Sequence, residues 1–266
     1  MNIWRNLVLL VTLTVATASH AVAQSNEKTD FQLGGGGWQH PFGLAFPPVQ
    51  GSALPVWQDR GHRFDNAANS WRIGDISNAN LKPWVKELMK KDNDEIDAGK
   101  IQFSTNSSCL PSGVPMFMLT GGPFYFVQTP TKIVIIEEAN PQVRHIYLNV
   151  PHSADVRPSW LGESVGRYEG DTLVVDTIGL NTKTVIDNFG TPHTEKLHVV
   201  ERWHLIDGGN TLEVNIAVDD PDTFHRPWQT YQRYRRAQRP LAEFICAENN
   251  TNLFDYHMPV ADKADF

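Results

Sequence analysis

Residues 197–218 read LHVVERWHLIDGGNTLEVNIAV and carry the clearest structural signal in the chain. Apolar and polar side chains alternate on both sides of the segment DGGN, as they do in strands that bury one face. Glycine-containing turns that join two alternating runs are typical of β-hairpins. The stretch therefore predicts two antiparallel strands joined by a tight turn.

Other stretches have the length and composition of strands and are separated by Gly, Pro, Asn or Asp. They are FYFVQT (124–129), KIVIIEE (132–138), RHIYLNV (144–150), DTLVVDTI (171–178), QTYQRYRR (229–236) and LAEFIC (241–246). Strand, helix and strand do not alternate along the sequence, which argues against a parallel α/β fold. We expect an all-β, mainly antiparallel fold, either a lipocalin-like β-barrel or a β-sandwich.

Residues 1–23 have the features of a secretory signal peptide. Arg5 precedes an apolar run over 7–18, and Ala-Val-Ala precedes Gln24, so we expect cleavage after Ala23. The apolar run is shorter than the roughly 20 residues that a membrane-spanning helix needs. The sequence predicts a periplasmic or secreted protein without an integral membrane anchor.

The exported part divides into an arm and a domain. Residues 24–79 are rich in Gly, Pro, Asn and Gln and predict an irregular arm, laid over the domain through Trp38, Phe46, Trp57 and Trp71. Residues 80–266 are expected to form a single β domain that includes one helix near 83–98. Pro83 suits the first turn of this helix and Gly99 suits its C-terminal end. Its apolar stripe is expected to rest on the barrel or sandwich and consists of Leu81, Val85, Leu88 and Met89.

Charge and cysteine content limit the partners and the compartment. The net charge is −7 without a basic block, so nucleic acids and anionic membrane surfaces are poor partners. Cys109 and Cys246 both lie in the exported part, where an oxidising compartment allows a disulfide. A bridge would tie the start of the β region to its last strand and would contribute about 4–5 kcal/mol. Two buried free thiols remain the alternative.

Residues 162–166 read GESVG, which matches the G-x-S-x-G motif of serine hydrolases. That motif needs a buried strand before the serine and a helix after it. Here VRPSWL precedes it, and RYEGDTLVVDTI, which reads as a strand after a Gly-Asp turn, follows it. We therefore interpret Gly162, Gly166 and Gly170 as turn and bulge positions and Ser164 as a turn or strand hydroxyl. A nucleophilic Ser164 with a distant histidine partner remains the alternative.

Strand alternation places three charged residues, Arg144, Asp176 and Glu201, on faces that are otherwise apolar. A buried ionised carboxylate is costly unless it is paired, so one or both carboxylates should meet Arg144 or a histidine. A structural ion pair across the sheet is one interpretation. A polar cluster at the bottom of a ligand cavity is the other, and there a carboxylate with a raised pKa could act as an acid or a base.

Two loops supply histidines near these strands. Asp187 and His193 flank NFGTP, which runs into the strand of Glu201, so His193 could reach the mouth of the fold and move protons near neutral pH. A loop histidine that binds a backbone carbonyl is the alternative. The segment VPHSADVRPSW holds His152 and Asp155 in a comparable loop, where a structural role for His152 is the simpler interpretation.

The sequence contains no C-x-x-C, H-E-x-x-H or H-x-H metal motif. In HVVE, His198 and Glu201 are three residues apart, which places them on opposite faces of a strand. Histidines and carboxylates from separate strands could still bind zinc. We predict neither a metal nor a cofactor.

Blocks from about Leu81 to the C-terminus resemble a large family of signal-bearing bacterial proteins of uncharacterised activity. The blocks are LKPWVKELMKKDNDE, CLPSGVP, FVQTP, RHIYLNVPHS, SWLGESVGRYEGDTLVVDTIGLNTKT, DNFGTPHTEKLHVVERW, LEVNIAVDDP, RPW and CAENN. The resemblance implies that both cysteines belong to the family pattern, as do residues 162–176, Asp187, His193 and Glu201. Many relatives read Thr-Trp-Leu-Asp where this chain has Thr184-Val185-Ile186-Asp187, so no role follows for an aromatic residue at position 185.

Our leading hypothesis is an exported β-barrel or β-sandwich with an internal cavity that binds a small, largely apolar or aromatic molecule. Asp176, His152, Trp203 and Tyr147 are the candidate ligand-binding residues. An extension of the hypothesis is metal-free acid–base chemistry of the lyase, hydratase or isomerase type. Its candidate residues are Glu201 as acid or base, His193 as partner, Asp187 to orient His193, and Arg144 to pair with Glu201 or bind an anionic group. A non-enzymatic carrier, a metal-dependent hydrolase and an interaction protein of the cell envelope are the alternatives, and the sequence leaves the oligomeric state open.

Overall fold

A computed structural model describes residues 29–31, 37–39, 74–100, 105, 109–119, 123–138, 142–187, 189–237 and 239–246. The predicted signal peptide and most of the predicted arm, including Phe46, Trp57 and Trp71, lie outside these residues.

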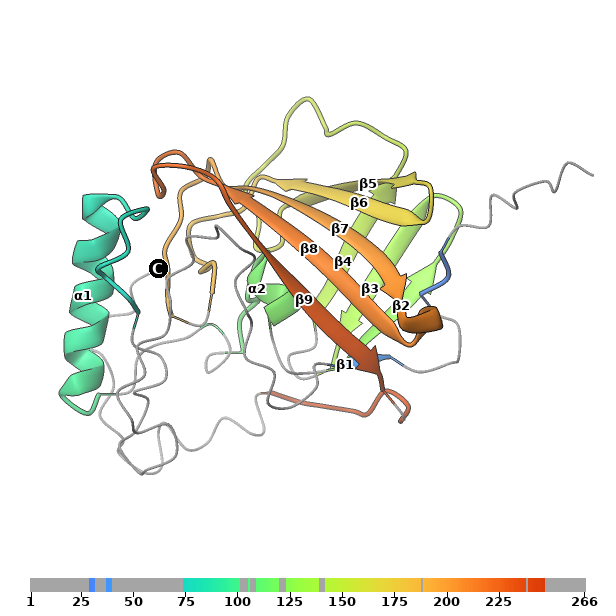
Figure 1. Cartoon of the computed structure of the whole chain (residues 1–266), viewed down its shortest axis with the longest axis horizontal. Coiled ribbons are helices and arrows are strands. Elements are labelled where there is room, and N and C mark those ends of the chain that lie inside the picture. The colour runs from blue at the N-terminus through green and yellow to red at the C-terminus, as the bar shows by residue number, and fades with distance from the viewer. Residues whose placement is uncertain are drawn as a thin grey trace, which may run out of the picture.

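The described strands form one closed β-barrel (Figure 1). In barrel order they are β1 (Trp38–Gln39), β2 (Phe124–Gln128), β3 (Lys132–Glu137), β4 (Gln142–Leu148), β5 (Glu163–Glu169), β6 (Thr172–Ile178), β7 (His198–Ile206), β8 (Thr211–Asp219) and β9 (Trp228–Arg236). Neighbouring strands are antiparallel, except that β4 and β5 are parallel. This confirms the predicted all-β, mainly antiparallel, lipocalin-like barrel and excludes the sandwich.

The hairpin predicted from residues 197–218 is formed by β7 and β8. Its register runs from His198 opposite Asp219 to Ile206 opposite Thr211. The short 3-10 helix η3 (Asp207–Gly209) makes the turn, and all three of its residues have positive φ. Two glycines supply this backbone conformation at little steric cost, which explains why the segment DGGN stands at the turn.

Two strands lie where the sequence predicted none. Trp38 of β1 pairs with Phe124 of β2 and with Arg236 of β9, so a piece of the predicted arm closes the barrel. A strand of two residues is too short to show an alternation, which is why the sequence gave no sign of it. The other strand, β5, begins inside GESVG, so Gly166 is a strand residue and not a turn residue. A Cβ on Gly166 would lie 2.8 Å from Cγ2 of Ile146, and the absence of a side chain therefore allows β4 and β5 to approach closely.

The stretch 241–246 is not a strand, contrary to the sequence prediction. Leu241, Phe244 and Ile245 are exposed large apolar side chains in this segment. The backbone N–H of Ala242 in this segment donates a hydrogen bond to Glu138 at 2.7 Å. A disulfide joins Cys246 at the end of the segment to Cys109. The Cα atoms of the two cysteines are 5.6 Å apart. The disulfide therefore ties two irregular segments together, in place of the predicted link to a last strand.

Helix α1 (Pro83–Asp97) is confirmed, with Gly99 at positive φ just beyond its end. Val85, Met89 and Ile96 form its buried side, whereas Leu88 of the predicted stripe is 41% exposed. The helix packs against loops at one end of the barrel: the indole N–H of Trp84 donates to the carbonyl oxygen of Asp222 at 2.7 Å. Figure 1 shows α1 beyond the barrel end and not along its wall.

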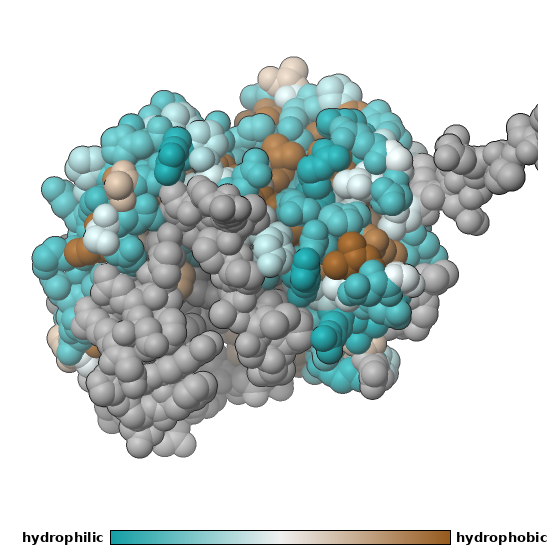
Figure 2. Space-filling model, in the orientation of Figure 1, coloured by the Kyte–Doolittle hydropathy of each residue, from teal (hydrophilic) through white to brown (hydrophobic). Residues whose placement is uncertain are grey.

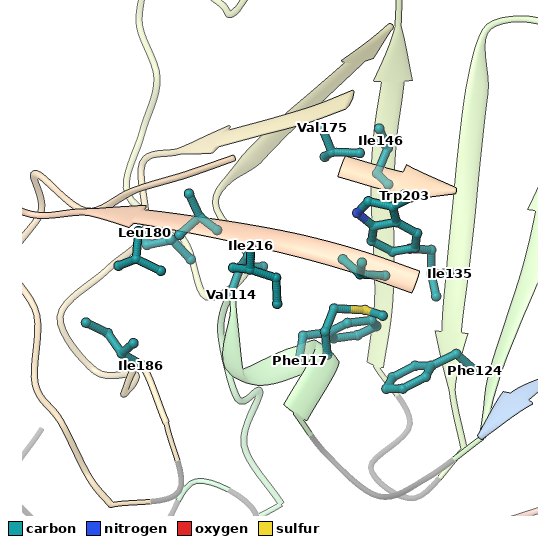
Figure 3. Packing of buried hydrophobic residues seen from close by; sticks show 14 of the residues in the cluster. Val114, Phe117, Phe124, Ile135, Ile146, Val175, Leu180, Ile186, Trp203 and Ile216 are labelled. Carbon is teal, nitrogen blue, oxygen red and sulfur yellow. The ribbon is translucent and has the colours of Figure 1, made fainter. Parts of the chain in front are cut away.

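The barrel interior is filled by side chains, including those of a short helix that the sequence did not reveal. This helix is α2 (Met116–Leu119), and Phe117 and Met118 on it are completely buried. Figure 3 shows Phe117 inside the barrel together with Phe124 and Trp203. The Phe117 and Phe124 ring centroids are 5.5 Å apart, and the Tyr234 hydroxyl donates to the carbonyl oxygen of Met118. These contacts fix α2 as part of the core.

The visible described surface is mainly hydrophilic, with small separate apolar areas (Figure 2). Val143 and Tyr147, on the outer face of β4, are among the exposed large apolar residues. None of the described helices has the length and apolar character needed to cross a membrane.

Candidate functional site

Arg144 of β4 and Glu201 of β7 form an ion pair inside the barrel. Their side chains are 1% and 0% exposed. Nη1 of Arg144 donates to Oε1 of Glu201 at 3.2 Å, and Nη2 donates to Oε2. Strand alternation predicted that both side chains point inward, and the pairing that it required for Glu201 is present. The geometry is the two-pronged contact in which a guanidinium binds a carboxylate most strongly.

Two hydroxyl groups complete the environment of the guanidinium. Nε and Nη2 of Arg144 donate to Oγ of Ser164 at 3.3 and 3.2 Å, and Nη2 also donates to Oγ1 of Thr177 at 3.0 Å. The two hydroxyls are 2.8 Å from each other. Ser164 therefore serves the buried network, and its described partners are an arginine and a threonine. A nucleophilic serine would instead need a histidine base at this distance.

Aromatic rings surround this network. The Arg144 guanidinium carbon lies 6.0 Å from the ring centroids of both Phe117 and Trp203. Burial raises the pKa of Tyr234 well above its usual value, and the charges of Glu201 and Glu137 add to the effect, so Tyr234 stays a neutral donor. Among the described residues, the Trp203 indole N–H and the Thr230 hydroxyl are buried without a hydrogen-bond partner. The interior therefore retains unused hydrogen-bonding capacity beside the ion pair.

A pocket of about 330 Å³ opens in the barrel wall next to this network. One side is formed by the outer face of β4 and the other by the segment that leads into β5. It is lined by Val143, Arg144, His145, Tyr147, Asp155, Val156, Arg157, Leu161, Gly162, Glu163 and Ser164. Arg144 and Ser164 border the pocket although they are almost fully buried, so the pocket lies against the part of the wall behind which the polar network is enclosed.

The strand pairing explains why the pocket lies at this point of the wall. β5 pairs with β4 only through Ile146, Tyr147 and Leu148 of β4. The first half of β4 extends beyond this pairing, and the chain crosses from the end of β4 to the start of β5 through residues 149–162. The uncovered part of β4 and the returning segment are the two sides of the pocket.

His152 lies in a second charged cluster, on the outside of the barrel. Its Nδ1 is 2.9 Å from Oε1 of Glu163, and its Nε2 is 3.0 Å from Oδ1 of Asp176. The same Asp176 oxygen lies 2.9 Å from Nε2 of His198. Hydrogen bonds from the Ser153 hydroxyl, the Ser153 backbone and His152 lower the pKa of Glu163 and more than offset the effect of burial. Asp176 thus has the histidine partners that the sequence required, but on the outer face.

His193 and Asp187 are buried in the loop before β7, each with its own partners. Nε2 of His193 is 2.8 Å from Oγ1 of Thr184, and Nδ1 is 2.9 Å from the carbonyl oxygen of Thr194. Asp187 accepts hydrogen bonds from the Thr191 hydroxyl at 2.8 Å and from the Phe189 backbone at 2.9 Å. Burial lowers the pKa of His193, and burial raises that of Asp187 although the hydrogen bonds oppose this rise. Neither residue lines the wall pocket, and the described contacts do not bring either one to Glu201.

Of the two predicted aromatic ligand-binding residues, only Tyr147 reaches the pocket. It is 46% exposed, and its ring stacks with that of His145 at a centroid distance of 6.4 Å. Trp203 instead belongs to the core. Sequence reasoning missed Val143, Leu161 and Thr177. Thr177 was missed because the sequence analysis assigned the opposite face of β6, that of Asp176, to the interior.

In the described part of the chain, no group of three or more His, Cys, Asp or Glu side chains has an arrangement that could hold a metal ion. Comparisons with protein-family models, with curated proteins and with solved structures find no match to this chain.

Proposed function

We propose that the protein is an exported β-barrel that binds a small, largely apolar or aromatic molecule in the wall pocket. The observation that carries the proposal is an open pocket whose lining combines apolar and aromatic side chains with a few charged groups. Small-molecule sites typically combine an apolar lining with a few fixed polar groups, in volumes of about 300–1,000 Å³. At about 330 Å³, this pocket suits a molecule of one or two rings.

The lining supports this choice of ligand. Val143, Tyr147 and Leu161 supply apolar and aromatic surface, and Tyr147 offers a ring face for stacking. His145, Asp155, Arg157 and Glu163 of the lining supply polar atoms that could orient one hydrogen-bonding group of the ligand. The positive and negative side chains of the lining nearly balance, so the pocket favours neither a polyanion nor a polycation.

Binding without turnover is better supported than acid–base catalysis at Glu201. Both of its carboxylate oxygens accept hydrogen bonds from Arg144. A proton transfer between Glu201 and a ligand would first require this pair to separate in a completely buried place, which is costly. The carrier role therefore ranks first, and acid–base chemistry of the lyase or isomerase type remains the extension.

Export and a periplasmic or secreted location are part of the proposal. Their support is the signal-like N-terminus together with the Cys109–Cys246 disulfide, since disulfides persist mainly in oxidising compartments. Mass spectrometry of the N-terminus of protein recovered from the native cells would test the predicted cleavage after Ala23.

Two measurements test the binding function. Native mass spectrometry of the protein purified from its own cells should show a small molecule that is lost on denaturation. In parallel, the aromatic fluorophore 8-anilinonaphthalene-1-sulfonate should bind, and Tyr147→Ala should weaken its affinity about tenfold, the value of one good stacking contact. Tyr231→Ala on β9, a partly buried tyrosine outside the pocket, is the matched control and should bind like the wild type. Equal affinities of Tyr147→Ala and the wild type would refute the assignment of the pocket.

A further inference from the structure

We propose that protonated His152 is a latch that holds residues 150–158 in place as the outer side of the wall pocket. The latch is a property of the segment itself. Its effect on ligand access rests on the proposed function, because it matters for a ligand only if the pocket binds one.

The geometry requires two donors on one imidazole ring. Nδ1 and Nε2 of His152 each lie within hydrogen-bonding distance of a carboxylate oxygen, at 2.9 Å from Glu163 and 3.0 Å from Asp176. A neutral imidazole has a single N–H, and its other nitrogen carries a lone pair that would face a carboxylate lone pair. Only the protonated ring can donate to both carboxylates. The distances therefore allow a full bridge between β5 and β6 when the ring carries both protons.

The other charged groups around this ring fit that state. From β7, Nε2 of His198 contacts the same Asp176 oxygen, and Asp219 of β8 lies opposite His198 in the register. On the segment itself, Asp155 and Arg157 form an exposed ion pair at 3.8 Å and largely cancel each other. Glu163 and Asp176 thus supply the two negative charges that a protonated His152 can neutralise.

The latch acts on the part of the segment that lies between two fixed points. The backbone N–H of Asn149 donates to Gly166 at 2.8 Å, and that of Ser159 donates to Gly179 at 2.9 Å. Between these points, the polar contacts described from the segment to the strands are those of His152 and Ser153 with Glu163 and Asp176. Asp155, Val156 and Arg157 of this part line the pocket, and so does Glu163. The groups that hold the segment are therefore next to the pocket that it covers.

The direction of the pH response follows from the proton count. With a proton on both nitrogens, the ring donates to both carboxylates and the segment is held. Loss of one proton removes one of the two contacts, while Ser153 still holds Glu163. The segment should then open more often, and the pocket should become more accessible.

Hydrogen exchange of the full chain tests the latch without any ligand. Amide protection over residues 150–158, corrected for the intrinsic pH dependence of exchange, should fall about tenfold between pH 5.5 and pH 8 in the wild type, as expected for one charge-assisted hydrogen bond. His152→Gln should show the same low protection at both pH values, because a glutamine amide does not titrate and presents an acceptor oxygen, not a donor, on the side opposite its nitrogen. His204→Gln is the control, since His204 also pairs with a carboxylate, Glu213, on the barrel exterior at 3.3 Å. It should behave like the wild type.

Each outcome separates the latch from the binding function. Protection that is independent of pH in the wild type, or identical in the wild type and His152→Gln, overturns the latch even if Tyr147→Ala weakens binding of the fluorophore. Protection that follows the expected pattern supports the latch even if Tyr147→Ala has no effect, in which case the proposed function fails alone. When both hold, the fluorophore should associate faster at pH 8 than at pH 5.5, and His152→Gln should remove the difference.

Discussion

The buried Arg144–Glu201 pair allows a quantitative test through a double-mutant cycle of Arg144→Met, Glu201→Leu and the double variant. In Glu201→Leu, the Arg144 charge would keep only the Ser164 and Thr177 hydroxyls as partners. Leaving one charge of a fully buried pair without its partner costs about 3–5 kcal/mol. We expect each single variant to lose about 3 kcal/mol or more in the free energy of unfolding.

The double variant should recover much of this loss. Two apolar side chains of similar size leave no buried charge, and Ser164 and Thr177 still bond to each other at 2.8 Å. We therefore expect a coupling energy of at least about 2 kcal/mol between the two sites. Urea denaturation followed by tryptophan fluorescence measures all four proteins, provided that they share one m-value.

The reasoning is refuted if the single variants lose less than about 1 kcal/mol, or if their losses add in the double variant within about 0.5 kcal/mol. A stable Glu201→Leu protein that binds its ligand but no longer converts it would instead indicate a carboxylate that serves catalysis. The cycle thus distinguishes the structural from the catalytic interpretation of the same residue.

Three further predictions concern stability. Replacing both Cys109 and Cys246 by Ser should lower the free energy of unfolding by about 4–5 kcal/mol, because the long loop in the unfolded chain is no longer closed; thermal unfolding of the oxidised wild type and the variant measures this. Burial lowers the pKa of His193, so below about pH 6.5 the unfolded state binds more protons than the folded state. The free energy of unfolding should therefore decrease as the pH is lowered below about 6.5, and His193→Gln should flatten this part of the pH profile in urea titrations. Gly179→Ala should lower the free energy of unfolding by about 1–3 kcal/mol, because Gly179 has φ +70° and a Cβ there would lie 2.3 Å from Cγ1 of Val156. The same clash should increase hydrogen exchange in the pocket wall, and unchanged exchange would show that Val156 does not hold the wall.

Strand alternation predicted the fold and the direction of key side chains well, because a barrel with one filled face imposes a period of two on its long strands. The inward direction of Arg144 and Glu201 and the β7–β8 hairpin follow from it. Asp176 shows the limit of this signal. Val174, which shares its face, is buried on the outer side of the barrel by other parts of the chain, so the apolar neighbours of Asp176 did not identify the inner face.

Elements that pack through few residues could not be predicted from a periodic pattern. The β1 strand has two residues and α2 has four, yet Trp38 closes the barrel and Phe117 fills it. The predicted acid–base group of Glu201, His193 and Asp187 required contacts between a strand and a loop, which alternation does not report. Local hydrogen bonds to Thr184 and Thr191 occupy the two loop residues, as is common for polar side chains in turns.

The wall pocket is a consequence of strand number. Neighbours in a closed ring of strands can all be antiparallel only if the number of strands is even, and the described barrel has nine. One neighbouring pair must then be parallel, and in this barrel it is β4 with β5. Parallel neighbours need a long crossover and not a tight turn, and here that crossover is residues 149–162. The crossover brings His152 to the barrel surface and forms the outer side of the pocket, while the short pairing leaves the first half of β4 free to form the other side. The proposed ligand site and the proposed latch therefore depend on the same topological feature.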